Sequence, residues 1–465
     1  MLQATNPSDK ERSGESRTPA GAIPLSRRSL LKSLGVGGVS LWLGNLLAAC
    51  SPPASRGSAP AAGEAAAQPV EEERVIEFMN WGAVEGTPLQ AAIDAFSEAT
   101  GIPVKVWPVP ARYEDKMRTL LAAGTTPDVM RVNDDYVRGY TVKKQLTDLR
   151  PYIEASGLNE DDFFSFIYQF PMYEGGYWAW CLGNQPRVIF YNVDLFKEAG
   201  VELPPTEWNP NEGWTWDDFL ETAQKLTKGE EQFGALVYHD TGYEQTFSIN
   251  NGSPSGIYSE DGLRFTLADP EGVEAVQWCT DLTCVHNVQP TRGLLAQLNA
   301  SQLFIGGKVA MVFTGSTTAI DFRNNITDFE WDIAPVPMRK KRFTEGSLIV
   351  FCIPRSAKHP DLGWQLLEWM TNQEMGELFA STRYFIPIRK SAAATLEPDG
   401  SPPNNVKLLA VANEYQTTVN FTENTERARQ IYRPQLDLVY TCKESAETVL
   451  NQVRPEVEAA LAGKF

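Results

Sequence analysis

The chain has 465 residues, with 41 Lys and Arg against 59 Asp and Glu, which gives a formal net charge of −18. Residues 1–49 hold six of the basic and three of the acidic side chains, so the remainder carries −21. This acidity argues against binding of nucleic acid and against electrostatic attachment to anionic lipid. It also disfavours strongly anionic ligands, unless a local basic pocket compensates. Residues 50–465 suffice for two domains with buried cores.

The first 50 residues indicate an export signal. Paired arginines within residues 26–32 precede an uncharged stretch at 33–49 that is too short and too weakly apolar to span a bilayer. The Leu-Ala-Ala-Cys tetrad ending at Cys50 resembles the lipobox of bacterial lipoproteins, in which the cysteine is acylated and becomes the mature N-terminus. The arginine pair fits twin-arginine export, with Sec export as the alternative. We therefore expect an extracytoplasmic protein that Cys50 anchors to the cell membrane.

A tether and then alternating strands and helices follow. Residues 51–73 are rich in Ala, Pro, Gly, Ser and Glu, which predicts a disordered linker. The predicted strands cover residues 75–80, 104–107, 128–132, 188–191, 234–238, 309–313 and 348–353. The predicted helices cover residues 88–100, 113–123, 193–199, 216–226, 361–371 and 428–461, the last interrupted near Pro434 and Pro455. This order predicts an α/β fold with mostly parallel sheets flanked by helices.

The cysteines and histidines do not suggest a disulfide framework or a metal site. Five cysteines follow Cys50 at irregular spacing. Cys279 and Cys284 lie five apart on a predicted helix, which places them on different faces and too far apart for good bridge geometry. Cys352 falls in an apolar strand and is expected to be buried. The three histidines are scattered, so we expect no metal and no cofactor.

Several longer motifs occur in a specific order. They are residues 96–104 (FSEATGIPV), 119–129 (TLLAAGTTPDV), 191–200 (YNVDLFKEAG), 214–219 (WTWDDF), 304–311 (FIGGKVAM) and 334–338 (APVPM). In this order and spacing they resemble the extracellular solute-binding proteins of ABC importers, of the sugar-binding, maltose-binding-protein-like type. The resemblance implies two α/β lobes with a ligand cleft between them, lobe one at 74–182 plus 333–372 and lobe two at 187–330 plus 375–465. It also implies hinge closure around the ligand.

Ligands of open α/β sheets collect beyond the carboxyl ends of the strands, and this rule selects candidate residues. Those that follow or precede predicted strands are Trp81, Gly82, Asn133, Asp134, Asp135, Thr314, Gly315, Ser316, Glu345 and Gly346. The family likeness adds Asn250, Asn251, Gly252, Arg383 and Tyr384, and the predicted crossover adds Trp178 and Trp180. Aromatic faces with carboxylate, amide and guanidinium partners suit a neutral polyol.

Several of these candidates have a structural alternative. Trp178 and Trp180 could be core residues, Asp134 and Asp135 could form a solvated turn or a helix cap, and Arg383 could form a surface ion pair. The basic run at 339–342 is expected to be a solvated hairpin loop.

The resemblance implies a binding component that delivers a mono- or oligosaccharide to an ABC permease with a cytoplasmic ATPase, acting as a monomer. A polyamine, a peptide or a phosphorylated polyol are alternative ligands. The competing class is an exported carbohydrate-active enzyme, since acidic residues are plentiful. No Gly-x-Ser-x-Gly, His-Glu-x-x-His, phosphate-loop or dinucleotide motif occurs in the sequence. We therefore expect binding and no catalysis.

Overall fold

The computed structural model describes residues 74–464. The predicted export signal at 1–49, the lipidation site at Cys50 and the tether at 51–73 lie outside the described residues. Within 74–464, no helix is long and apolar enough to cross a bilayer.

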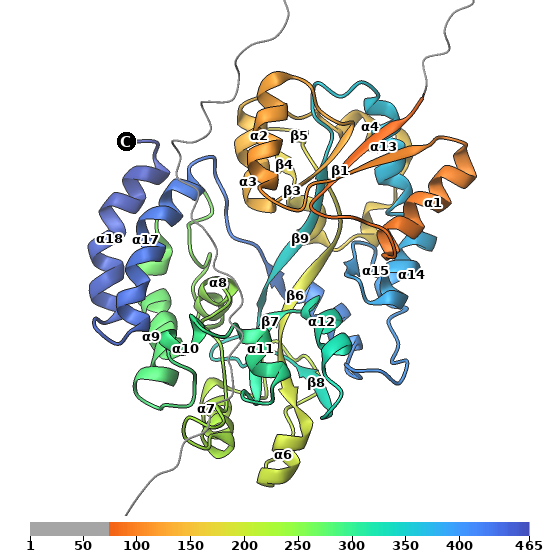
Figure 1. Ribbon diagram of the computed structural model, residues 1–465. Helices are drawn as coiled ribbons and strands as arrows, with labels where there is room; N and C mark the ends of the chain where they lie inside the picture. The colour runs from red at the N-terminus through yellow and green to blue at the C-terminus, as the bar shows by residue number, and fades with distance from the viewer. Residues whose placement is uncertain (1–73, 465) are drawn as a thin grey trace, which may run out of the picture. The chain divides into compact units, whose positions relative to one another are not determined.

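The described elements belong to two lobes that share two long strands (Figure 1). Lobe one contains β1 (Ile76–Asn80), α1 (Pro88–Thr100), β2 (Val104–Pro108), α2 (Tyr113–Ala123), β3 (Val129–Val132), α3 (Asp134–Val142), α4 (Arg150–Ser156), α5 (Ser165–Gln169), β4 (Met172–Tyr173), β5 (Gly176–Tyr177), α13 (Pro360–Trp369), α14 (Gln373–Thr382), β10 (Ile386–Pro387) and α15 (Lys390–Ala393). Lobe two contains α6 (Val193–Ala199), α7 (Trp216–Leu226), α8 (Gly242–Asn250), α9 (Pro270–Cys284), α10 (Arg292–Leu295), α11 (Ala300–Ile305), β7 (Met311–Gly315), α12 (Thr318–Asn325), β8 (Trp331–Ala334), α16 (Lys407–Ala412), β11 (Gln416–Thr417), α17 (Thr425–Tyr440) and α18 (Ala446–Leu461). The shared strands are β6 (Trp180–Asn192) and β9 (Thr344–Cys352).

Local sequence signals begin and end the helices as expected. The Thr87 side chain accepts a hydrogen bond from the backbone N–H of Gln90, and Gly101 ends α1 in the left-handed conformation. Thr215 and Asp218 form a capping box at the start of α7. These caps determine where α1 and α7 begin and where α1 ends, and therefore where the adjoining loops begin.

The sheet topology brings the strand ends of the two lobes together. β1 pairs in parallel with β2 and β3, and β9 runs antiparallel to both β3 and β6. β6 pairs with β9 as far as Pro186, which lies opposite Gly346. From Arg187 onward β6 pairs with β7 and β8 instead. The two lobes are therefore continuous through β6 and β9.

Contacts around β9 place the lobe boundaries differently from the predicted ones. Met338 still bridges to Thr215, beside α7 of lobe two, so the chain returns to lobe one near residue 344 and not at 333. Farther on, β10 pairs with the lobe-one part of β6, and Arg389 of the α14–α15 region forms an ion pair with Asp162. We therefore assign residues 373–396 to lobe one, where the prediction gave lobe two from 375.

Two other expectations need correction. α17 and α18 continue through Pro434 and Pro455, and the break lies between them, where Cys442 adopts a positive φ and Ser445 caps α18. The basic run at 339–342 is not wholly solvated, because Arg342 is 1% exposed. Its guanidinium donates hydrogen bonds to the backbone carbonyls of Val336, Asn209, Glu212 and Trp214.

Cys284, at the end of α9, forms a disulfide with Cys442 after α17. Cys279 is a free buried thiol, so it does not pair with Cys284, as expected from their spacing. Cys352 is buried, as predicted. The bond ties two helices of lobe two together across a sequence separation of 158 residues.

Breaking this bond is expected to destabilise the protein. Cys442→Ser should lower the free energy of unfolding by about 2–3 kcal/mol, since a long loop is no longer closed in the unfolded chain. Urea unfolding followed by tryptophan fluorescence measures the loss. Cys279→Ala is the matched control, because it removes a buried thiol from the same helix without breaking a bond. Equal stability of Cys442→Ser and the parent protein would contradict the expectation.

Candidate functional site

The carboxyl ends of the strands in both lobes face the same junction. In lobe one, the parallel strands β1 and β3 end next to β9, where Val132 pairs with Val350. In lobe two, β7 ends at Gly315, which lies opposite Arg187 of β6. The segment ending at Tyr238 runs parallel to β7, since Leu236 bridges to Val312. Loops of both lobes therefore meet where β6 and β9 cross between them, which is where ligands of α/β sheets collect.

Trp81 lies at the lobe-one edge, directly after β1. Its ring is half-buried, packs edge-on against Tyr113 at 5.8 Å, and carries the guanidinium of Arg131 at 4.2 Å from its centre. The indole N–H is buried and has no hydrogen-bond partner within the described part of the chain. An indole with an unused donor at a strand end can serve as a platform for a ring with polar edges.

Three polar residues follow β3 and begin α3. Asn133 donates a hydrogen bond to Glu114 at 2.9 Å. Asp134 accepts hydrogen bonds from the backbone N–H groups of Asp135 and Leu348, the latter on β9. Burial, and then the neighbouring charge of Asp135, raise the pKa of Asp134 to about 6. This carboxyl group can therefore act as a donor or an acceptor near neutral pH.

The crossover itself carries a charged cluster. Arg187 of β6 forms ion pairs with Asp240, through Nε and Oδ1 at 2.7 Å, and with Glu345 of β9. The three side chains are 11–14% exposed. Burial acts to raise the pKa of Asp240, but the charge of Arg187 outweighs it, and the pKa lies below its ordinary value. The cluster holds the start of lobe two against the two shared strands.

One ion pair joins the lobes directly. Asp135, in the first turn of α3 of lobe one, pairs with Arg429 of α17 of lobe two. The guanidinium of Arg429 also lies 4.9 Å from the ring centre of Phe421. We call the set Trp81, Asp134, Asp135, Arg187, Asp240, Glu345 and Arg429 the inter-lobe site. Its members come from both lobes and from both crossover strands.

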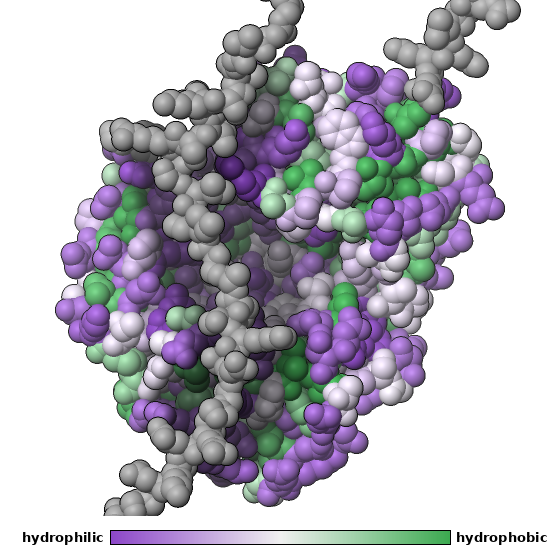
Figure 2. Space-filling view, in the orientation of Figure 1, coloured by the Kyte–Doolittle hydropathy of each residue, from purple (hydrophilic) through white to green (hydrophobic). Residues whose placement is uncertain are grey.

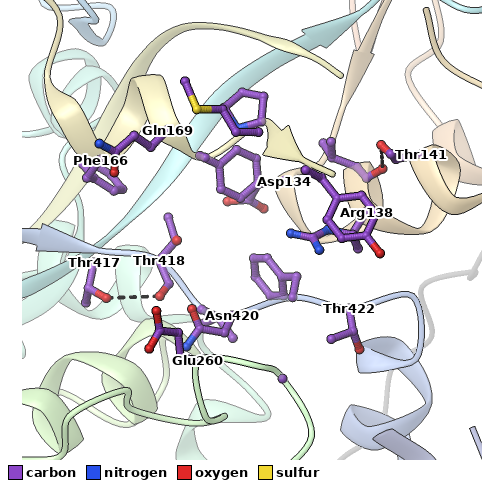
Figure 3. A pocket seen from close by; sticks show the side chains of 18 of the residues that line it. Asp134, Arg138, Thr141, Phe166, Gln169, Glu260, Thr417, Thr418, Asn420 and Thr422 are labelled. Atoms are coloured by element: carbon purple, nitrogen blue, oxygen red, sulfur yellow. Dashed lines mark hydrogen bonds between the residues drawn. The ribbon is translucent and has the colours of Figure 1, made fainter. Parts of the chain in front are cut away.

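A cavity of about 490 Å³ is lined by residues of both lobes and shares Asp134 with this site (Figure 3). Lobe one contributes Asp134, Arg138 and Thr141 of α3 together with Phe166 and Gln169 of α5, and lobe two contributes Glu260 and the segment 416–422. The Arg138 guanidinium stacks on the ring of Tyr173 at 3.7 Å. Aromatic rings, hydroxyl groups and amides line the cavity (Figure 3). On the face seen in Figure 2, the surface is recessed between the two lobes, with hydrophilic residues at the margin of the hollow.

Many of the predicted ligand residues lie at this junction. Thr314 and Gly315 form the end of β7, and Ser316 follows it with its N–H donating to the carbonyl of Pro186 on β6. Gly346 lies opposite Pro186, where a Cβ would approach Gln416 Oε1 to 1.8 Å. Tyr384 is half-buried and lies near Arg131, whose guanidinium covers the Trp81 ring. Gly82 follows Trp81 with open space around its Cα.

The structure places other predicted residues elsewhere. Trp180 is fully buried in lobe one, 4.9 Å from Trp364, and Trp178 donates to the carbonyl of Tyr173 away from the crossover. Asn250 and Asn251 are buried inside lobe two, where Asn250 accepts from Phe343 N–H and Asn251 donates to Glu271 and Glu274. Gly252 packs against Lys340. Arg383 is 6% exposed and binds the 397–401 loop. We leave these residues out of the inter-lobe site, because each lies inside one lobe or binds a neighbouring loop. Asn250 Nδ2 and Asn251 Oδ1 are nevertheless buried without a hydrogen-bond partner in the described part of the chain.

The sequence analysis missed Arg187, Asp240 and Arg429. Asp240 follows the predicted strand at 234–238, so the strand-end rule applied there would have found it. Arg187 follows Pro186 where β6 changes partners, a position without a distinct sequence signal. Arg429 lies within a helix far along the chain, and only tertiary structure brings it to Asp135. Within 74–464, no group of three or more His, Cys, Asp and Glu side chains could hold a metal ion.

Two α/β lobes whose strand ends face a shared, polar junction define the class of two-lobed ligand-binding proteins. The family model of bacterial extracellular solute-binding proteins matches residues 91–407. The chain belongs to this family, and the predicted membership and two-lobed α/β fold are confirmed.

The curated relatives named below are 22–24% identical to the chain over the aligned stretches. An erythritol/L-threitol-binding protein of Mycolicibacterium smegmatis is 22% identical over 80% of this chain and 83% of its own length. An arabinooligosaccharide-binding protein of Bacillus subtilis is 24% identical over 61% of this chain and 65% of its own. A putative binding protein of Brucella abortus is 23% identical, and the match spans 66% of its length, slightly under two thirds.

Solved structures show the same fold. An ABC substrate-binding protein of Listeria monocytogenes in complex with cycloalternan superposes with a TM-score of 0.73 at 21% identity, covering 83% of this chain and 99% of that one. The sugar-binding protein MalE of Xanthomonas citri gives 0.69 at 17% identity, covering 84% and 98%.

Proposed function

We propose that the protein binds a carbohydrate between its two lobes and delivers it to the membrane permease of an ABC importer. The observation that carries the proposal is the meeting of polar strand-end residues from both lobes, with Asp135 and Arg429 in direct contact. Membership of the solute-binding family supports the transport role. The printed names of similar proteins, which include polyol, arabinooligosaccharide and cycloalternan binders, support the class of ligand.

The chemistry of the site agrees with a hydroxyl-rich ligand. A sugar has apolar faces that an indole such as Trp81 can cover. Its hydroxyl groups both donate and accept hydrogen bonds, so carboxylates and guanidinium groups can serve them together. Each hydrogen bond to a charged group contributes about 1.5–3 kcal/mol, so a few of them suffice for micromolar affinity after ordering costs.

The remaining features of the proposal concern location and partners. We propose an extracytoplasmic protein, exported through the signal at 1–49 and held to the cell membrane by an acylated Cys50. It acts as a monomer without cofactor, and the loaded form docks on permease subunits served by a cytoplasmic ATPase. It releases its ligand unchanged, as expected of a family of binding proteins.

Addition of the correct sugar is expected to raise the melting temperature of the purified protein. A ligand at 100 times its dissociation constant adds about 2.7 kcal/mol to the free energy of unfolding. A thermal-shift screen of tetritols, pentoses, hexoses and their oligomers measures this, with chromatography of the recovered sugar to show that it is not consumed. Stabilisation by a polyamine or a peptide, with none by any sugar, would contradict the proposal that the ligand is a carbohydrate.

Trp81→Ala supplies the matched test of position. Loss of the indole should weaken sugar binding by at least about tenfold, or 1.4 kcal/mol. Trp369→Ala is the control, because this half-buried ring of lobe one packs on Phe96 of α1, away from the junction. Its affinity should equal that of the parent protein. Unchanged affinity in Trp81→Ala would remove this residue from the site.

A further inference from the structure

The cavity of about 490 Å³ adjoins the inter-lobe site along one face of α3. Asp134 belongs to both the site and the lining of the cavity. Arg138 and Thr141 follow Asp134 at spacings of four and three residues, so the three side chains share a face of the helix. A helix rises about 1.5 Å per residue, so this face extends the lining roughly 10 Å away from the start of α3.

Lobe two connects the site to the cavity in the same way. The guanidinium of Arg429, a member of the inter-lobe site, lies 4.9 Å from the ring centre of Phe421, which lines the cavity. In the pairing of β11 with β9, Thr417 of the cavity lies opposite Glu345 of the site. The cavity therefore borders the inter-lobe site on both lobes.

The lining of the cavity combines aromatic rings with groups that donate and accept hydrogen bonds (Figure 3). Its half-buried rings come from both lobes and are Phe166, Phe170, Tyr173 and Phe421. Arg138, stacked on Tyr173 at 3.7 Å, offers N–H groups. Asn420 donates its amide N–H to the carbonyl of Tyr258 at 3.1 Å, so its amide oxygen remains an acceptor. Apolar faces bordered by groups of both kinds suit sugar rings and their hydroxyl groups.

The charge and the size of the cavity narrow the class of ligand. Of the described residues that line it, Asp134, Glu260 and Asp261 are acidic, and Arg138 is the only basic one. This balance disfavours an anionic ligand. The volume lies within the range of about 300–1,000 Å³ that is typical of sites for drug-sized ligands. Trp81 is not among the lining residues, so a single sugar ring that covers Trp81 would leave the cavity to water.

We propose that the ligand is a neutral oligosaccharide, with one unit against Trp81 and the following units in the cavity beside α3. This inference rests on the proposed function and narrows its ligand class from any carbohydrate to a chain of at least two units. Arg138 and the ring of Tyr173 contact the later units from lobe one, and Phe421 contacts them from lobe two. Each additional unit buries more apolar surface and adds hydrogen bonds, so the affinity should rise with the length of the sugar.

Calorimetric titration with sugars of increasing length tests the proposal. The probes are glucose with maltose and maltotriose, xylose with xylobiose and xylotriose, and mannose with mannobiose and mannotriose. For at least one series, the full chain should bind the dimer or the trimer at least about tenfold more tightly than the monosaccharide. Arg138→Ala should reduce this ratio to less than about threefold, because the cavity loses its guanidinium donors.

Lys143→Ala is the matched control, since Lys143 is an exposed cation directly after the same helix and is not among the residues that line the cavity. It should keep the affinities of the parent protein, and both variants should melt within a few degrees of that protein. A monosaccharide that binds as tightly as its oligomers, or an Arg138→Ala variant that keeps the full preference for the longer sugar, would overturn the inference and leave the proposed function standing. Failure of every sugar to bind would overturn both.

Discussion

Arg187→Met is expected to lower the free energy of unfolding by about 3–5 kcal/mol, as happens when one partner of a buried ion pair is removed. Arg187 neutralises both Asp240 and Glu345, and all three side chains are mostly shielded from water. Without the guanidinium, two carboxylates remain close together in a poorly solvated junction. Urea unfolding at pH 7 measures the loss.

Two further variants serve as a control and as a rescue for Arg187→Met. Lys225→Met removes a partner of an exposed ion pair with Glu221 and should cost less than about 1 kcal/mol. Adding Asp240→Asn and Glu345→Gln to Arg187→Met should restore part of the stability, because the unpaired charges are gone. If Arg187→Met were as stable as Lys225→Met, the charged cluster would not contribute to the stability of the junction between β6 and β9.

Arg342→Met is expected to cost about 4 kcal/mol, since it leaves several buried carbonyl groups without donors. The Arg342 guanidinium serves carbonyls from the 209–214 loop and from Val336. Burial lowers the pKa of Arg342 to about 10. The folded protein therefore holds this proton less tightly than the unfolded chain. Stability should decrease as the pH falls from about 12 to 10, and stay level below 10.

Lys340→Met is the matched control for Arg342→Met. Lys340 belongs to the same basic run but is exposed, so its loss should change stability by less than about 0.5 kcal/mol. Urea unfolding of both variants makes the comparison. Similar stabilities would show that the 209–214 loop does not depend on the buried guanidinium.

The sequence predicted the fold well where the signal was local. Thr87, Gly101 and Thr215 begin or end helices as their residue types indicate. The predicted strand ends also identified much of the junction, because periodicity predicts β1, β3 and β7 and the residues that follow each strand can then be read from the sequence. Residues 314–316 and Glu345 accordingly lie where β6 and β9 cross.

Long-range packing could not be predicted in the same way. The sequence alone could not show that Trp180 is a core residue, because its burial depends on packing against Trp364 from a distant part of the chain. Arg342 and Lys340 share one basic run, yet only the fold decides which is buried. The pairing of Asp135 with Arg429 joins residues 294 positions apart. Such contacts depend on side-chain directions that composition and spacing do not fix.

The pairing of Pro186 on β6 with Gly346 on β9 affects how the two lobes can move relative to each other. Proline has no N–H to donate, so the ladder that connects the lobes is weakest at this pair. Gly346 has no side chain there, and the amides of Asn184 and Gln416 fill the space that a Cβ would need. Bending of β6 and β9 should therefore concentrate at this pair, and each lobe should rotate about it as a rigid body. A bulkier residue at position 346 would then restrict the hinge motion between the lobes before it disturbed the fold of either lobe.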